Sequence, residues 1–263
     1  MSLHPAKPSS ASQQDATAFL GGLPVTTRDM EHSSKHFIAQ AIAARGQTAL
    51  PFYSTSANGQ VIALAAKDEE FRSLLLSADE IHADGMPMVL LSRLLTRNPI
   101  HERVATTDLV HAVAAEAELA GVSFYFLGGT PDVSQRAVEA MRQKYPKLIF
   151  AGASDGYFSA EQEAGVVDDI ARLQPDILWI GLGVPLEQQF VARNIEKLRG
   201  VGVIKTSGGL FDFLAGKNSR APKWMQNVGL EWAYRTVLEP RRLALRYLST
   251  NPVALQQLLT NSR

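Results

Sequence analysis

The chain of 263 residues contains no cysteine, so neither disulfide bridges nor thiolate metal ligands are available to it. This composition suits a reducing compartment, and we expect a cytoplasmic protein. No uncharged apolar stretch reaches the roughly 18 to 20 residues that a membrane-spanning helix needs. The sequence also lacks an Asp-x-Asp motif, and its 6 histidines show no metal-ligand spacing. We therefore expect no bound metal.

A net charge of zero conceals an uneven distribution of charge along the chain. Residues 217–263 carry 8 Lys and Arg against 2 Asp and Glu, whereas residues 1–216 carry 18 against 24. Such an asymmetry indicates that the C-terminal segment meets an anionic partner, such as phosphates, nucleic acid or a lipid surface. Docking of this segment on the acidic remainder of the chain is the alternative.

Composition divides the chain into three parts. Residues 1–18 are rich in Ser, Ala and Pro and lack the apolar core of a signal peptide, so we expect a disordered leader. Residues 19–216 form the expected α/β domain. Residues 217–263 form a basic helical appendage.

Strand-like and helix-like segments alternate through 19–216, which is typical of an α/β fold with a Rossmann-like, largely parallel sheet and helices on both faces. The expected strands are 49–56, 80–84, 122–129, 147–152, 175–183 and 201–209. The expected helices are 30–45, 59–78, 86–95, 107–121 and 159–173. Helix-end signals are caps at Thr27 and Thr107, a stop at Gly121, and a capping box of Ser159 with Gln162.

Glycines cluster where the expected strands end. An open parallel sheet binds its ligand beyond the carboxyl ends of its strands, where backbone can approach phosphate groups. Any one pair could be only a tight turn, but three pairs together favour a nucleotide or another phosphate-bearing ligand. The third glycine of the dinucleotide fingerprint is missing, which makes an NAD-dependent oxidoreductase the weaker alternative. The pairs are Gly128 and Gly129, Gly181 and Gly183, and Gly208 and Gly209.

The stretch EIHADGMPMVLL, residues 80–91, places Asp84 between an expected strand and an expected helix. If its carboxylate capped that helix, Pro87 would occupy the third helical position and offer no N–H group. A carboxylate at the ligand edge of the sheet can instead accept a proton from a hydroxyl, as a general base does. Both roles stay open on the residues alone.

Residues 220–248 combine tryptophans with arginines. Trp224, Val228 and Trp232 recur every four residues and predict one face of a helix, and Pro240 predicts the start of a second helix. The composition fits an amphipathic segment on an anionic membrane, or arginines folded back on a diphosphate. An ordinary surface helix is the alternative. Nucleic-acid binding is not expected, because the acidic remainder shows no recognition motif.

Several of these stretches together resemble the WecG/TagA/CpsF family of bacterial glycosyltransferases, over about residues 21–247. The matching stretches occur in order and spacing: ADGMPMV, ERVATTDL, FYFLGGTPDV, PDILWIGLGVPLEQ and EPRRLALRYL. The string GGLFDFLAGKNSRAPKWMQNVGLEWAYR, residues 208–235, is the most specific of them.

The resemblance implies an inverting transfer from a UDP-sugar to a polyprenyl-diphosphate-linked sugar, without a metal or other cofactor, at the inner face of the cytoplasmic membrane. It makes Asp84 the candidate base. The implied substrate-binding residues are Ser56, Asn58, Arg103, Thr107, Asp108, Glu187 and Gln188, with the glycine pairs above holding UDP. The implied diphosphate and membrane contacts are Arg220, Arg235, Arg242 and Arg246.

Four positions depart from the family pattern. Ser56 stands where relatives carry threonine, and Thr106 stands where relatives often carry glycine. Glu187 and Gln188 reverse the usual Gln-Glu order, which puts the contact expected from the glutamine in question.

Within the family, the resemblance points to the β-1,4-glucosyltransferases of xanthan-type exopolysaccharide synthesis. We therefore expect transfer of glucose from UDP-glucose to glucosyl-diphosphate-polyprenol. The alternative donors are UDP-N-acetylmannosamine and UDP-N-acetylmannosaminuronic acid, with a lipid-linked amino-sugar acceptor. A non-catalytic membrane module is a further alternative, and a homo-oligomer is compatible with the sequence.

Overall fold

The structure, a computed structural model, describes residues 16–263, except the side chain of Arg242. Most of the predicted leader lies outside the described residues. Its last two positions, Thr17 and Ala18, lie in the first strand.

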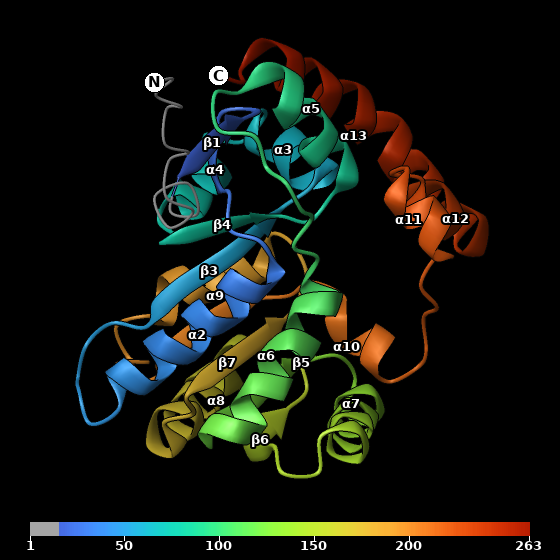
Figure 1. Ribbon diagram of the computed structural model, residues 1–263. Helices are drawn as coiled ribbons and strands as arrows, with labels where there is room; N and C mark the ends of the chain where they lie inside the picture. Colours follow the sequence, from blue (N-terminus) through green and yellow to red (C-terminus); the bar gives the residue numbers. More distant parts are fainter. Residues whose placement is uncertain (1–15) are drawn as a thin grey trace, which may run out of the picture.

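The predicted Rossmann-like architecture is confirmed: the centre of the molecule is a six-stranded sheet in the order β4-β3-β8-β7-β5-β6, with every pair parallel. Figure 1 shows helices on both sides of it. Strands covered on both faces are typically apolar runs, and the central strands β5 and β7 show this pattern, whereas β3, β4 and β8 also carry polar residues. Their bounds are β3 (Phe52–Ala57), β4 (Glu80–Ala83), β5 (Ser123–Gly128), β6 (Ile149–Ser154), β7 (Ile177–Gly181) and β8 (Val203–Thr206).

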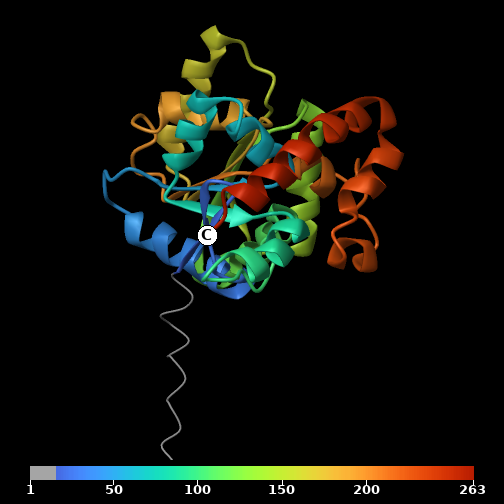
Figure 2. The ribbon, with the colours of Figure 1, turned by 90° about the horizontal axis from the view of Figure 1, so that it is seen from above.

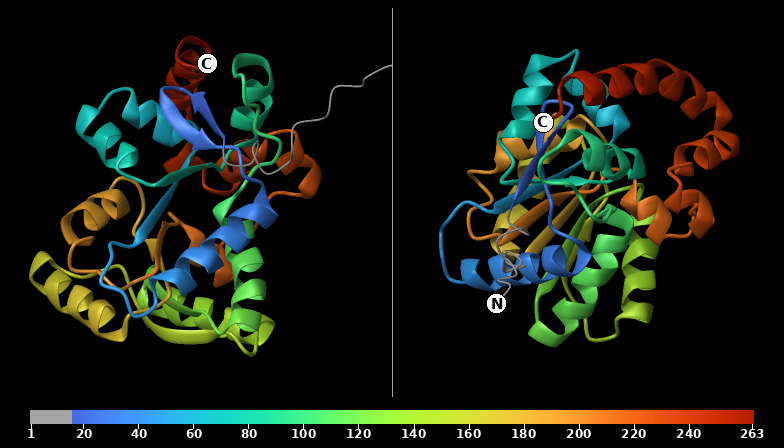
Figure 3. Two further views of the ribbon diagram at one scale, coloured as in Figure 1. Left: turned by 60° about the vertical axis from the view of Figure 1, so that its left-hand side comes forward. Right: turned by 45° about the horizontal axis from the view of Figure 1, so that its top comes forward.

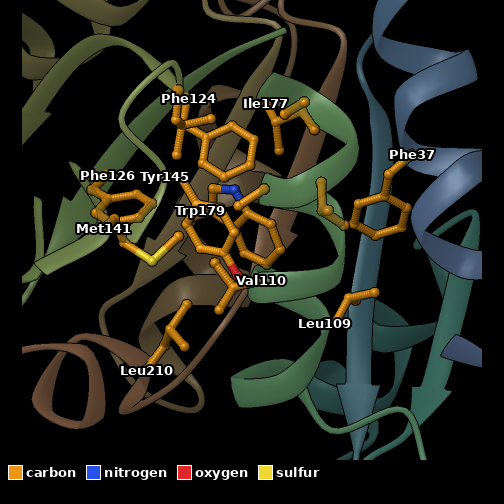
Figure 4. Packing of buried hydrophobic residues seen from close by; sticks show 14 of the residues in the cluster. Phe37, Leu109, Val110, Phe124, Phe126, Met141, Tyr145, Ile177, Trp179 and Leu210 are labelled. Carbon is orange, nitrogen blue, oxygen red and sulfur yellow. The ribbon is translucent and has the colours of Figure 1, made fainter. Parts of the chain in front are cut away.

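One face of the sheet carries the largest hydrophobic cluster. Phe37 of α2, Val110 of α6 and Met141 of α7 pack with Phe124 of β5 and Trp179 of β7, and all five are fully buried (Figure 4). This cluster packs α6 against the sheet and so places the first turn of α6 at the sheet edge. The helices are α2 (Met30–Ala44), α6 (Thr106–Ala120) and α7 (Pro131–Lys144).

The opposite face is covered by α8 (Ala160–Leu173) and α9 (Leu186–Asn194). Ile170 and Phe190 from these helices pack on Leu178 and Ile204 of the central strands. The three layers leave the carboxyl ends of the strands as the edge where loops and helix starts converge.

A third cluster lies at the β4 edge. An antiparallel hairpin packs with three helices there, and Leu20, Val61 and Met88 are among its buried residues. The elements are β1 (Thr17–Leu20), β2 (Leu23–Thr26), α3 (Gly59–Ala65), α4 (Glu69–Leu76) and α5 (Met86–Leu95).

The C-terminal segment leaves the sheet after α10 and returns to it at the chain end. Figures 2 and 3 show α11 and α12 standing to one side and α13 arching back over the body. Ala254 and Leu258 of α13 are buried in the third cluster, and Gly22 N donates to Asn261 O at 2.8 Å. The last turns are thus part of the folded body. The bounds are α10 (Leu210–Leu214), α11 (Lys223–Asn227), α12 (Glu231–Leu238) and α13 (Pro240–Thr260).

Several helix-end predictions are confirmed. Gly121 ends α6 in the left-handed conformation, and Ser159 and Gln162 form the capping box of α8. Pro240 begins α13.

Other predictions about helices were wrong. The single helix expected at 59–78 is two, because Asp68 caps α4. Asp29, and not Thr27, caps α2, while α6 begins at Thr106 without a side-chain cap. The face expected from Trp224 to Trp232 is interrupted between α11 and α12.

Candidate active site

Asp84 lies directly after β4, at the carboxyl edge of the sheet. Its backbone N–H donates to Ala57 O at 2.9 Å, which fixes it beside the end of β3. The cap of the following helix is Gly85, and no side chain caps α5. The capping role is therefore excluded, and the Asp84 carboxylate is available for chemistry.

Charges surround the Asp84 carboxylate. Burial raises its pKa to about 6, and the negative charge of Glu231 adds to that rise. The positive charges of Arg103, Lys205 and Arg220 oppose it. A carboxylate with a pKa just below neutrality is ionised at pH 7 and is matched to accept a proton in a transition state.

Lys205 of β8 lies beneath this edge and is fully buried. Its Nζ donates to Ser56 Oγ at 2.8 Å, and Ser56 Oγ lies 3.2 Å from Thr106 Oγ1. Burial lowers the pKa of Lys205 to about 8, although Glu80, Asp84 and Glu187 oppose that change. The predicted residue Ser56 therefore joins β3 to both β8 and α6.

Two arginines meet two carboxylates where the C-terminal segment faces α6. Glu231 accepts from Arg103 Nη1 at 2.7 Å and from Arg220 Nε at 3.1 Å. Arg220 also donates to both oxygens of Asp108, at 3.0 and 3.2 Å, and to Thr107 Oγ1 at 2.6 Å. We call Arg103, Arg220, Asp108 and Glu231 the arginine network. It joins the predicted residues to the appendage.

Gln226 of α11 supports the same network. Its Oε1 accepts from Arg103 at 3.0 Å and from Arg220 at 2.6 Å, and its Nε2 donates to Ala221 O at 2.7 Å. The side chains of α11 and α12 thus hold both guanidinium groups beside the sheet edge.

Two of the glycine turns are bound by a protein side chain. Gly183 N and Gly208 N donate to Glu187 Oε2, at 3.2 and 2.9 Å. Burial raises the pKa of Glu187 to about 7, although these amides oppose the rise. Gln188 is also buried, and its Nε2 lies 3.4 Å from Thr55 Oγ1. In this structure both N–H groups are engaged by Glu187.

The other predicted glycines have packing or turn roles. A Cβ at Gly128 would collide with the carbonyl of Gly181, and a Cβ at Gly181 would lie 2.8 Å from the Phe211 ring. Gly129 has a φ of +73°, and Gly209 precedes α10 as its cap.

The described contacts of the remaining predicted residues do not involve the arginine network. Asn58 caps α3 by accepting from Val61 N at 3.1 Å. The Arg235 guanidinium lies 5.4 Å from the centroid of the Phe213 ring. Arg246 lies over the ring of its neighbour Tyr247, at 4.8 Å.

Arg242 lies in α13, and its side chain is outside the described part of the structure. Among the described side chains of the four predicted tail arginines, that of Arg220 alone contacts other residues of the arginine network.

Comparisons with known proteins identify the family of this chain. A family model described as the glycosyl transferase WecG/TagA/CpsF family matches residues 18–263. The chain belongs to this family. The predicted resemblance is confirmed, and the protein is a glycosyltransferase.

A relative from Bacillus subtilis (strain 168) is 32% identical over 216 residues, which are 82% of this chain and 80% of the relative. That protein is named N-acetylglucosaminyldiphosphoundecaprenol N-acetyl-beta-D-mannosaminyltransferase. Its name corresponds to the amino-sugar alternative of the sequence analysis. The expected link to xanthan-type glucosyltransferases receives no support from this relative.

Sequence reasoning missed Lys205, Gln226 and Glu231. Lys205 had a signal, because a charged residue directly followed the apolar stretch 201–204 within an expected strand. Gln226 and Glu231 had no signal of their own beyond the long string that predicted the family.

In residues 16–263, no three His, Asp or Glu side chains are grouped closely enough to hold a metal ion.

Proposed function

We propose that this glycosyltransferase moves a sugar, with inversion, from a UDP-sugar to a polyprenyl-diphosphate-linked sugar, and that Asp84 is the base. The observation that carries the proposal is the Asp84 carboxylate itself. It lies at the carboxyl edge of a parallel sheet, caps no helix, has a pKa near 6 and faces three positive charges.

The chemistry requires two complementary tasks. The acceptor hydroxyl oxygen attacks the anomeric carbon while Asp84 takes its proton, and the bond from that carbon to the UDP oxygen breaks. The bonding electron pair leaves with UDP, whose diphosphate then needs positive charge. Arg103 and Arg220 are the candidates for that task, because both lie close enough to lower the pKa of Asp84 and both are held in place by Glu231.

The B. subtilis relative supports UDP-N-acetylmannosamine as donor and N-acetylglucosaminyl-diphosphoundecaprenol as acceptor. UDP-N-acetylmannosaminuronic acid is a related donor. UDP-glucose with a glucosyl-diphosphate lipid, which the sequence resemblance implies, is the second candidate. Glu187 and Gln188 are both buried at the sheet edge, and their reversed order favours neither donor.

We further propose that 217–263 serves both as a membrane-binding appendage and as part of the site, on the inner face of the cytoplasmic membrane. Apolar side chains stand exposed along the appendage: Trp224, Trp232, Val237, Leu245 and Leu248. Among the described residues, no helix is long and apolar enough to cross a membrane. Exposed aromatic and apolar groups beside basic residues favour binding to an anionic bilayer surface.

One assay tests the reaction. The protein is incubated with a panel of UDP-sugars and with lipid-diphosphate acceptors ending in N-acetylglucosamine or glucose, with EDTA or with Mg²⁺, and products are identified by mass. Asp84→Asn is expected to abolish product, while Asp169→Asn on the exposed face of α8 is the matched control. An Asp84→Asn enzyme within about tenfold of wild-type turnover would exclude Asp84 as the base.

A further inference from the structure

One face of the sheet carries a column of polar side chains that leads to Asp84. Side chains two residues apart on a strand point to the same face. Ser54 of β3 is in register with Glu80 of β4 and with Lys205 of β8. The column therefore spans three neighbouring strands. β4 and its end contribute Glu80, His82 and Asp84, β3 contributes Ser54 and Ser56, and β8 contributes Lys205.

Glu80 and His82, the other two β4 residues of the column, form hydrogen bonds with neighbouring side chains. Arg28 Nη1 donates to Glu80 Oε1 at 2.6 Å, and the His82 ring lies 3.2 Å from Ser54 Oγ and 3.1 Å from Ser33 Oγ. Burial lowers the pKa of His82 well below its ordinary value, with the positive charges of Lys205 and Arg28 acting in the same direction. His82 is therefore neutral and brings no charge to the site.

Lys205 differs from the other charged groups of the site. Its side chain is fully buried, and its described hydrogen bond is to the neutral Ser56 hydroxyl at 2.8 Å. No carboxylate of the described residues makes an ion pair with Nζ within 4.0 Å. Three acids face it at longer range, namely Glu80 from β4, Asp84 from the end of β4, and Glu187 from α9.

We propose that Lys205 is a positioning residue of the transferase. Its ammonium orients the Ser56 hydroxyl and supplies a positive charge, from inside the sheet layer, that favours the ionised form of Asp84 as the base. This inference rests on the proposed role of Asp84. Because Lys205 is buried, it acts through Ser56 and through its field, without touching substrate.

The other charges that face Asp84 are placed differently. Arg103 opposes the rise in the pKa of Asp84 more strongly than Lys205 does, but it is paired with Glu231, whose negative charge has the opposite effect. Arg220 is likewise paired with Asp108 and Glu231. A diphosphate bound by these arginines would reduce their effect on Asp84 further. Lys205 differs from them because its ammonium is buried inside the sheet layer, so a bound diphosphate would not form an ion pair with it.

The test compares three variants that separate charge from hydrogen bonding. Lys205→Met removes both the charge and the bond to Ser56, Lys205→Gln removes the charge but keeps an amide donor, and Ser56→Ala keeps the charge but removes the bond. The readout is the pH profile of kcat with UDP-N-acetylmannosamine and N-acetylglucosaminyl-diphosphoundecaprenol. Both Lys205 variants are expected to move the acid limb upward by about one pH unit or more. Ser56→Ala is expected to lower kcat without moving the limb.

An acid limb that stays within about 0.2 pH unit of wild type in both Lys205 variants would overturn the proposal, because a structural role lowers kcat at every pH alike. If Asp84→Asn is itself active, the proposed function fails instead, so the two failures are distinguishable.

A second measurement needs no activity. Asp84→Asn is made in the wild-type and the Lys205→Met backgrounds, and the midpoints of urea unfolding are compared at pH 7.5. The proposal predicts a larger stabilising effect of Asp84→Asn in the Lys205→Met background, where the carboxylate has lost its countercharge. If Lys205→Met does not fold alone, the double variant is expected to recover folding. Equal effects in both backgrounds, or no recovery, would contradict it.

Discussion

Asp84→Asn is expected to stabilise the folded protein while it removes activity. The pKa of Asp84 rises from 3.8 to about 6 on folding, mainly through burial. At about 1.4 kcal/mol per pKa unit, this rise corresponds to about 3 kcal/mol. A carboxyl group with a raised folded pKa contributes stability below its unfolded pKa and loses that contribution as the pH rises through its folded pKa. Above pH 6 the ionised carboxylate therefore opposes folding, and a neutral amide does not.

The comparison is made by thermal and urea unfolding of wild type and Asp84→Asn at pH 7.5 and at pH 4. At pH 7.5 a gain of about 3 kcal/mol corresponds to a rise of about 6 to 12 °C in Tm for a protein of this size. At pH 4 most of the gain should disappear, because the folded-state carboxyl group is then protonated. Asp169→Asn, which removes an exposed carboxylate of α8, should change stability little at either pH. A destabilised Asp84→Asn protein, or a gain independent of pH, would refute the reasoning.

Two further predictions concern the appendage and the glycine turns. Replacing Trp224 and Trp232 together by serine should reduce sedimentation with anionic vesicles. Because both rings are exposed, the Tm of the variant should stay within a few degrees of wild type. Unchanged sedimentation would argue against the membrane role. Gly128→Ala should destabilise by at least about 2 kcal/mol in urea unfolding, because its Cβ meets the Gly181 carbonyl. Gly165→Ala, in α8 with open space around it, is the matched control and should stabilise by up to about 1 kcal/mol. A tolerated Gly128→Ala would mean that this close approach is not required.

The sheet was predictable because its strands carry their own signal. The strands β5 and β7 are apolar runs that end at glycine, while β3, β4 and β8 are short stretches with apolar residues bounded by turns or helices. The parallel arrangement follows from the helices between them. The hairpin β1–β2 was not predicted, since Thr17 and Ala18 belong in composition to the leader that precedes them. Its position depends on tertiary contacts, such as the bond from Arg263 N to Phe19 O at 3.0 Å.

The site was predictable only in part, because local features can be read from the sequence but contacts between distant segments cannot. Asp84 could be placed at the ligand edge, because the end of a strand and the start of a helix are local features. The pairing of Arg103 with Glu231 joins distant parts of the chain and has no local pattern. The bond from Lys205 to Ser56 depends on the neighbouring positions of β3 and β8, which strand order along the sequence does not specify.

The path of the appendage explains how Arg220 can be held beside Asp84 by a segment that stands away from the sheet. Before it, α10 is anchored by Leu210 and Phe211, which are buried in the largest cluster. After it, the end of α13 is anchored by Ala254 and Leu258 in the third cluster. Between these anchors, the arginine network fixes α11 and α12 against α6.

Removing all residues after Gly216 would therefore delete part of the core as well as the exposed tryptophans. Unfolding alone would then account for a loss of membrane binding or activity in that truncation. Substitutions at exposed positions between the anchors separate the two causes, because they leave both clusters intact.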